Sequence, residues 1–209
     1  MPVPSLRGGC EMTRSRENTR ARLLEAAHDV FAEVGVDAAS VEAICERAGF
    51  TRGAFYSNFE SKDELFLALI TRLSEDKLDE VSVRVRRLSG TDSPLDLVRQ
   101  IADMSLAERM EPQLLSEVRA QALRDPRLAE AFLAWRAQML GRIETIVRDV
   151  SERHGLPLRM PVADAASLLL DVSEQCSVQA ALERLSERQA NRAMQSRLEQ
   201  LVPLLVGEA

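Results

Sequence analysis

Apolar positions in the first third of the chain recur every three or four residues, the spacing of an amphipathic helix. Leu23, Ala27, Val30 and Phe31 share one face of a helix predicted over about 17–34. A glycine follows directly and can end this helix in the left-handed conformation. Residues 1–12, before this helix, contain two prolines, a glycine pair and no periodicity, so we expect a disordered tail.

Two short helices and a long one are predicted next, over about 40–48, 51–58 and 61–85. A serine and a threonine stand as N-caps at the start of the two short helices, and a glycine separates the helices. The segment SKDE fits a capping box for the long helix, because the serine side chain can accept from the N–H of Glu64 and the Glu64 carboxylate can return to the serine N–H.

The remaining pattern is helical as well. The segment LSGTDSP, residues 88–94, is the clearest linker signal, and no stretch alternates in the manner of a strand. The fold class is therefore all-α. Beyond the linker we predict five helices, over about 93–109, 112–123, 126–153, 161–186 and 189–206.

These breaks divide the chain into a tail and two domains. We assign residues 1–15 to the tail, 16–75 to an N-terminal domain and 76–209 to a larger C-terminal helical domain. Met12 is a candidate for the true start, since helix-compatible sequence begins shortly after it.

Composition narrows the class of protein. No apolar run reaches the roughly 18 residues of a membrane-spanning helix, and the N-terminus lacks the apolar segment of a secretory signal. Cys10, Cys45 and Cys176 are widely spaced with no C-x-x-C pair, which indicates reduced thiols rather than disulfides or a zinc site. We therefore expect a cytoplasmic protein without a metal or another cofactor.

The net charge of −6 is unfavourable for binding nucleic acid unless positive charge is concentrated locally. Arg14, Arg16, Arg20 and Arg22 are opposed in their stretch only by Glu17, and this forms a modest basic patch. A solvated helix end explains the same residues equally well.

Residues 40–59 have the layout of a helix-turn-helix, with the turn AGFT between two short helices. A small residue allows the two helix axes to cross closely, and Gly49 can adopt a positive φ. The alternative is an ordinary corner between two helices of a bundle.

The wider pattern resembles the N-terminal domain of the TetR/AcrR family of transcriptional regulators. The resemblance rests on A-A-x-x-x-F-x-x-x-G at residues 26–35, then SVEAICERAGFTRGAFYSNF, then SKDEL before a long helix. It covers about 60 residues, and the rest is similar only in helical layout. It implies a three-helix DNA-binding domain and a C-terminal ligand-binding and dimerisation domain.

On this basis the second short helix is expected to lie in the major groove of double-stranded DNA. Phe55 and Phe59 should point into the core together with Phe31 and Phe66. Arg52 is the side chain able to contact guanine in a bidentate manner, and Ala54 can meet a thymine methyl. The predicted DNA-binding residues are Ser40, Thr51, Arg52, Ala54, Tyr56, Ser57, Asn58 and Lys62.

Two of these residues are assigned through the family. Tyr56 matches a tyrosine that commonly contacts the DNA backbone, and Lys62 resembles a phosphate clamp at a helix N-terminus. Glu42 departs from the expected surface, since it is acidic. It can accept from a cytosine amino group, but a helix N-terminus that favours negative charge also explains it.

The family layout implies a homodimer that binds an inverted-repeat operator. The last two helices carry stripes of small and of apolar residues that suit such an interface, although burial within one subunit is the alternative. The predicted interface residues are Ser173, Ser177, Ala181, Met194, Leu198, Leu201 and Leu205.

A small-molecule effector is also implied, and the sequence gives little about it. The walls of an aliphatic cavity would include Leu115, Val118 and Ile143, each of which is equally plain core. The effector-binding candidates are Met104, Glu117, Gln121, Trp135, Met139 and Gln175.

Other functions have less support. His28 and His154 have no metal-ligand spacing, and no G-x-S-x-G or phosphate-binding loop is present, so an enzyme is disfavoured. A thiol sensor lacks a basic cluster near its cysteines. A repressor released by its effector is expected, with an activator or a ligand-independent DNA-binding protein of the same fold as alternatives.

Overall fold

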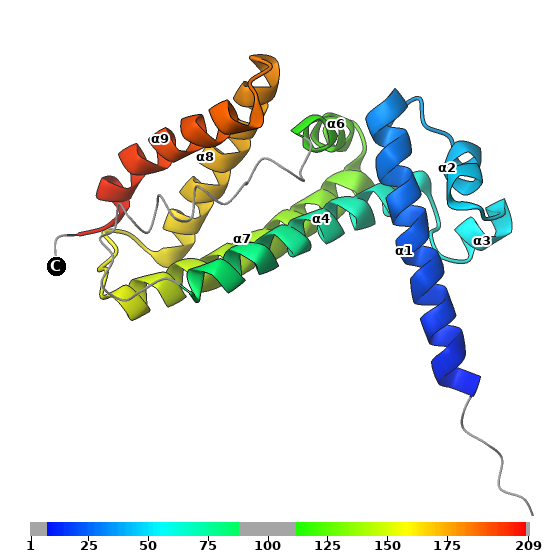
Figure 1. The fold of residues 1–209 in the computed structure, drawn as a ribbon, viewed down its shortest axis with the longest axis horizontal. Helices are drawn as coiled ribbons and strands as arrows, with labels where there is room; N and C mark the ends of the chain where they lie inside the picture. The colour runs from blue at the N-terminus through cyan, green and yellow to red at the C-terminus, as the bar shows by residue number, and fades with distance from the viewer. Residues whose placement is uncertain (1–7, 88–111, 208–209) are drawn as a thin grey trace, which may run out of the picture. The chain divides into compact units, whose positions relative to one another are not determined.

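The computed structural model describes residues 8–87 and 112–207, and these residues are helical apart from turns and one isolated bridge between Leu158 and Val206 (Figure 1). This confirms the predicted all-α class. The helices are α1 (Gly8–Val34), α2 (Val41–Ala48), α3 (Arg52–Tyr56), α4 (Lys62–Val85), α6 (Pro112–Ala122), α7 (Pro126–His154), α8 (Val162–Leu182) and α9 (Glu187–Leu205).

The first helix differs most from the sequence expectation. α1 begins at Gly8, whereas the periodic pattern starts near residue 17, so α1 starts inside the segment expected to be a tail. Residues 8–16 contain no proline, and a helix can extend through them without an apolar face of its own. The expected helix over 93–109, and with it Met104, lies outside the described residues.

The chain forms two compact units, residues 1–71 and 72–209, and α4 contributes residues to both. In the first unit α1 and α2 pack together and α3 packs on α2 (Figure 1). Its core contains the predicted aromatic cluster, since Phe31, Phe55, Phe59 and Phe66 are each at most 2% exposed. The Phe31 and Phe66 rings meet edge to face at 5.3 Å.

Local signals set the boundaries of the two short helices. Ser40 and Thr51 have extended backbone, and their hydroxyls accept from the N–H of Ala43 and Ala54 at 3.1 and 3.3 Å. Gly49 ends α2 in the left-handed conformation with φ 72°, where a side chain would be strained. The N-cap and glycine predictions are confirmed at these positions.

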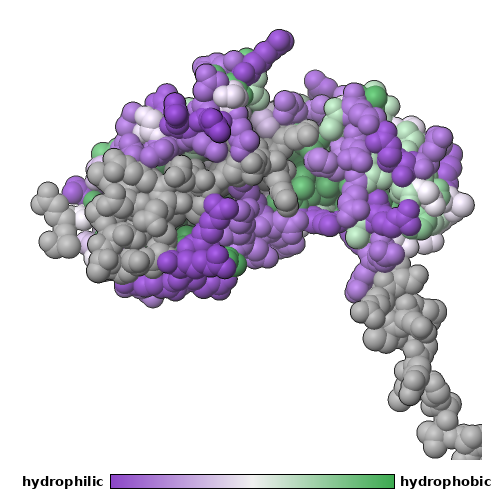
Figure 2. Space-filling view, viewed as in Figure 1, coloured by the Kyte–Doolittle hydropathy of each residue, from purple (hydrophilic) through white to green (hydrophobic). Residues whose placement is uncertain are grey.

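In the second unit α7 packs on α6 and α8, and α8 packs on α9. Asp125 caps α7, and a left-handed Gly155 ends it. The faces of α8 and α9 that meet bury Leu198 and Met194 against Leu169 and Cys176. The coloured surface visible in Figure 2 is mainly hydrophilic, as expected when the apolar faces pack inward.

No helix of the described ranges is long and apolar enough to cross a lipid bilayer.

Candidate functional site

Helix α3 presents a small polar surface. Phe55 is fully buried and anchors the helix to the core, while Thr51, Arg52, Tyr56 and Ser57 around it are exposed. Ser40 at the start of α2 is exposed as well, so five of the eight predicted DNA-binding residues are accessible. Ala54 is half-buried. The hydroxyls of Ser40 and Thr51 accept from their own helices and keep an O–H to donate.

Asn58 does not project outward as expected. It is 9% exposed, its amide Nδ2 donates to the carbonyl of Ala54 at 2.8 Å, and Arg20 donates to the Asn58 carbonyl at 2.7 Å. Helix α3 ends at Tyr56, so the chain turns and directs residue 58 back toward α1. The prediction that Asn58 faces DNA is wrong for this structure.

Lys62 is also engaged within the protein. Its ammonium donates to the carbonyls of Val36 and Ala39 at 2.7 and 3.0 Å, and more weakly to that of Asp37 at 3.4 Å. These carbonyls belong to the turn after α1, where a cation is favoured by the helix dipole. Lys62 therefore fastens this turn to the start of α4, and the expected outward phosphate clamp is not what the structure shows.

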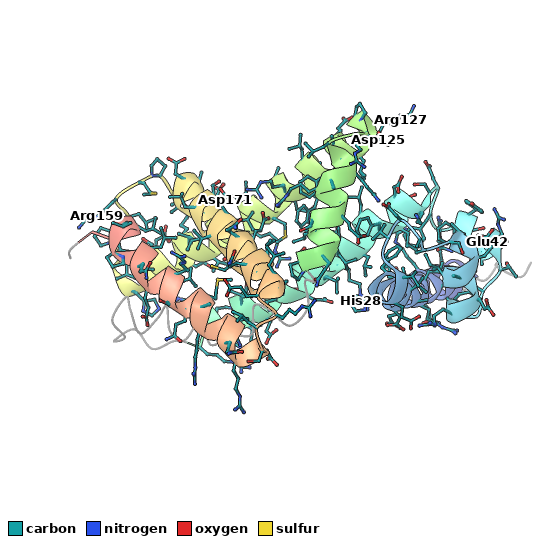
Figure 3. All side chains as sticks on the ribbon, turned by 90° about the horizontal axis from the view of Figure 1, so that it is seen from above. His28, Glu42, Asp125, Arg127, Arg159 and Asp171 are labelled. Carbon is teal, nitrogen blue, oxygen red and sulfur yellow. The ribbon has the colours of Figure 1, made fainter. Side chains whose placement is uncertain are left out.

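Arg52 is paired with Glu42 of α2. The guanidinium Nη1 donates to the Glu42 carboxylate at 2.5 Å, and both side chains remain more than half exposed. In Figure 3, Glu42 is labelled on the surface of the first unit. The pKa of Arg52 is raised, first by a hydrogen bond with Tyr56 and then by the charge of Glu42.

Sequence reasoning placed Glu42 near DNA but missed its contact with Arg52. The two residues lie on different helices, and only the crossing of α2 and α3 brings their side chains together. The sequence signal that could have indicated this contact is the opposite charge of Glu42 and Arg52, each in the first turn of its capped helix.

The N-terminal arginines have a structural role that the sequence analysis did not foresee. Arg16 and Arg22 donate to the carbonyls of Ser57 and Ala48 at 3.0 and 2.8 Å, which satisfies backbone oxygens at the ends of α3 and α2. The guanidinium of Arg20 also lies over the Phe59 ring at 4.1 Å. Arg16, Arg20 and Arg22 of the basic patch thus hold the helix-turn-helix onto α1.

The described cysteines do not form a reactive site. Cys45 and Cys176 are free thiols. Burial raises the pKa of Cys45, and the charge of Glu42 raises it further; burial likewise raises the pKa of Cys176. A raised pKa keeps a thiol protonated and unreactive. Among the described residues no cluster of His, Cys, Asp or Glu is arranged to hold a metal ion.

The second unit contains a partly open cavity of about 250 Å³. Its described walls come from α4, α6, α7, α8, α9 and the segment between α7 and α8, and they are predominantly aliphatic. Of the effector candidates, Met139 lies in the wall, as do Leu115 and Ile143. This volume is slightly below the roughly 300–1,000 Å³ typical of small-molecule sites.

The other candidates among the described residues lie elsewhere. Trp135 is buried and stacks near Phe132 at 5.2 Å, and Glu117, Gln121 and Gln175 are absent from the described lining. These four residues therefore do not line this cavity, and their contact with an effector stays a prediction. Periodicity identified the inward faces of the helices, but it did not distinguish a face on a cavity from a face on close-packed neighbours.

Most of the residues expected at a dimer interface are used inside the subunit. Met194, Leu198 and Leu205 are at most 6% exposed, while Ala181 and Leu201 are half-buried. Ser173 and Ser177 of α8 line the cavity, together with Met194, Leu198 and Leu205. The apolar stripe of α9 packs on α8 of the same chain, which was the alternative left open by the sequence.

Comparisons with known proteins agree with the helix-turn-helix geometry. Residues 23–69 match the sequence profile of the family described as "Bacterial regulatory proteins, tetR family". The chain is 25% identical over 162 residues to the HTH-type transcriptional regulator UidR of Escherichia coli, covering 78% of this chain and 81% of the relative.

Two further relatives extend the comparison. An HTH-type transcriptional repressor of Mycobacterium tuberculosis is 31% identical over 93 residues, which is 44% of this chain and 45% of that protein. A crystal structure from Mesorhizobium loti, described as a TetR-family transcriptional regulator, superposes with a TM-score of 0.70 at 20% identity, covering 92% of this chain and 98% of the other.

Proposed function

The chain belongs to the TetR family of DNA-binding transcriptional regulators, and we propose that it is a repressor released from its operator by a small-molecule effector. The observation that carries the proposal is the combination of an accessible α3 in the first unit with an aliphatic cavity in the second unit. The relatives are transcriptional regulators, and no enzymatic activity is proposed.

Helix α3 is proposed to enter the major groove and to read bases through Arg52. The exposed guanidinium supports this role, because its paired N–H donors match the O6 and N7 acceptors of guanine. Tyr56, Thr51 and Ser40 carry accessible hydroxyls suited to backbone phosphates, while Ala54 and Ser57 complete the surface.

A homodimer is proposed because one short helix reads only a few base pairs, and a two-fold pair of such helices reads two half-sites. The outer faces of α8 and α9 are the proposed interface in place of the buried stripe. Leu182 of α8 and Leu204 of α9 are 74% and 66% exposed. The operator is accordingly an inverted repeat, and binding takes place in the cytoplasm.

The effector is proposed to occupy the cavity of the second unit and to favour a conformation that does not fit the operator. Such a ligand shifts the equilibrium only by the difference between its affinities for the two conformations. The two alternatives would use the same DNA-binding surface as a repressor. An activator would raise transcription on binding DNA, and a ligand-independent regulator would stay on its operator when a ligand is present.

In vitro transcription separates these possibilities. A promoter that carries the protein's preferred DNA site is transcribed with and without the purified protein. A repressor lowers the amount of transcript, and a ligand found in the cavity restores it. A rise in transcript on adding the protein would establish the activator instead, and repression unchanged by a bound ligand would contradict release by an effector.

A further inference from the structure

The cavity of the second unit has a polar end and an apolar end, which follows from the side-chain pairs between its helices. Gln138 of α7 bonds Glu75 of α4 at 3.3 Å, and Arg142 forms an ion pair with Asp79 one turn further along both helices. Still further along, Val81 and Val85 pack with Ile146 and Val150. α4 and α7 therefore run side by side in the same direction.

The position of α8 is fixed in the same way. Arg136 of α7 bonds Glu174 at 3.1 Å and Asp171 at 2.5 Å, and Arg119 of α6 bonds Glu174 at 2.6 Å. Asp171 is labelled on α8 in Figure 3. The short segment 155–161 returns the chain from the end of α7 to the start of α8, so α8 runs back along α7.

The wall residues can now be sorted by level. The level of Gln138 and Arg136 contains most of the polar wall residues, namely Ser74, Lys77, Arg119, Ser173, Glu174 and Ser177. The level of Ile146 and Val150 contains mainly aliphatic residues, namely Val81, Ile146, Val150, Leu158, Leu205 and Val206. Ser151 also lies in the wall there, and its hydroxyl donates to the carbonyl of Leu156. A molecule lying along the cavity therefore meets hydrogen-bonding groups at one end and hydrocarbon at the other.

The charges at the polar end favour an anion. Among the described lining residues the charged side chains are Lys77, Arg119 and Glu174, which are two cations against one carboxylate. Arg136, outside the lining, is paired with Glu174 and Asp171. Glu174 is only 10% exposed and already accepts from both arginines, so it has little capacity left for a cationic ligand. Lys77 is 9% exposed, and its ammonium carries three donors, which suit an acidic head group in addition to a protein acceptor.

We propose that the effector is an amphipathic anion, with its acidic head held near Lys77 on α4 and its hydrocarbon body directed toward Val150 and Leu205. The inference rests on the proposed function, since it names the ligand class of the regulator's cavity. It also assigns a charge and an orientation, which the fold alone does not supply.

The test uses three matched probes at concentrations below micelle formation: decanoate, methyl decanoate and decyltrimethylammonium. Their affinities for the full-length protein are measured by titration calorimetry in the absence of DNA. Decanoate is expected to bind about tenfold or more tightly than either other probe, because only its head adds a charge-assisted hydrogen bond. Equal binding of all three, tighter binding of the cation, or no binding of decanoate would overturn the proposal.

Two variants locate the head and the body. Lys77→Met preserves most of the side-chain length and removes the charge, so decanoate should lose about tenfold in affinity while methyl decanoate is unaffected. Arg86→Met removes an exposed cation just beyond α4 and is the matched control, with no change expected. Unchanged decanoate affinity in folded Lys77→Met would contradict the assigned head position.

Ile146→Phe tests the other end without altering any charge. A larger side chain in the aliphatic part should weaken decanoate and leave the shorter hexanoate nearly unaffected. Equal losses for both probes would contradict the orientation. Because these titrations contain no DNA, they succeed or fail independently of operator binding. Decanoate that binds as described but leaves the protein on its operator would contradict the proposed effector response and not the ligand class.

Discussion

At the scale of single residues, Arg52 and Glu42 offer the sharpest tests of the proposed contact between α3 and DNA. Replacing Arg52 by Ala removes the bidentate donor, so discrimination at one base position should fall by about 1–3 kcal/mol. Binding of a set of operators with single base changes, measured by fluorescence anisotropy, checks this. Arg47→Ala removes an exposed guanidinium paired with Glu33 and should leave base preference intact. Preserved discrimination in Arg52→Ala would contradict the assignment.

In the proposed mode of binding, the Glu42 carboxylate competes with DNA for Arg52 and also repels phosphate. Glu42→Gln should therefore strengthen binding to all DNA sequences by about two- to tenfold, a modest effect because the ion pair is exposed. Anisotropy titrations at two salt concentrations measure it. The gain should shrink at high salt, since screening weakens both interactions. Weaker binding by Glu42→Gln would indicate instead that the carboxylate orients Arg52 productively.

Substitution of Lys62 distinguishes a structural role of this residue from direct contact with phosphate. Lys62→Met should lower the free energy of unfolding by about 1–3 kcal/mol, because several carbonyls of the turn after α1 lose a charged donor. Thermal unfolding measures the change. A phosphate contact would appear differently, as a decrease of about one in the slope of log affinity against log salt with stability unaltered.

At the scale of helices, Gly49 sets the angle between α2 and α3. Gly49→Ala should destabilise the protein by about 1–2 kcal/mol, since an L-residue is strained at φ 72° although the nearest neighbour, Arg22 Nη2, lies at 3.5 Å. Gly53→Ala is the control: it lies in α3, its added methyl would meet only Thr51 Oγ1 at 3.7 Å, and helix propensity favours alanine. Chemical denaturation measures the free energy of unfolding of both variants. Equal stabilities would contradict the proposed need for glycine at position 49.

Much of this element-level structure could be predicted from the sequence. Apolar periodicity and caps placed α2, α4, α6 and α7 within a residue or two at most ends, because those signals act locally. The same signals did not reveal where Asn58 and Lys62 point, nor that the α9 stripe is buried on α8. These depend on how the chain turns after Tyr56 and on which helix covers which, and such long-range packing leaves no periodic trace in one sequence.

At the scale of the whole molecule, α4 stands out among the described helices because it contributes residues to both compact units. We expect it to carry the effector signal. Thr71→Gly combined with Arg72→Gly should weaken the helix by about 2 kcal/mol at the division between the units. DNA binding and ligand binding should each persist, while release of DNA by the ligand is lost. The Thr71→Ala, Arg72→Ala pair keeps the helix and should respond normally. Normal release in the glycine pair would contradict this coupling.

The central claim is that α3 reads DNA as part of a two-fold dimer, and selection from a random double-stranded DNA library tests it most directly. The purified protein is incubated with the library, bound fragments are recovered over several rounds, and the enriched sequences are aligned. The account predicts an inverted repeat whose half-sites each contain a guanine that loses its enrichment when Arg52→Ala protein is used. Enrichment of no sequence, or of a single half-site without its repeat, would contradict it.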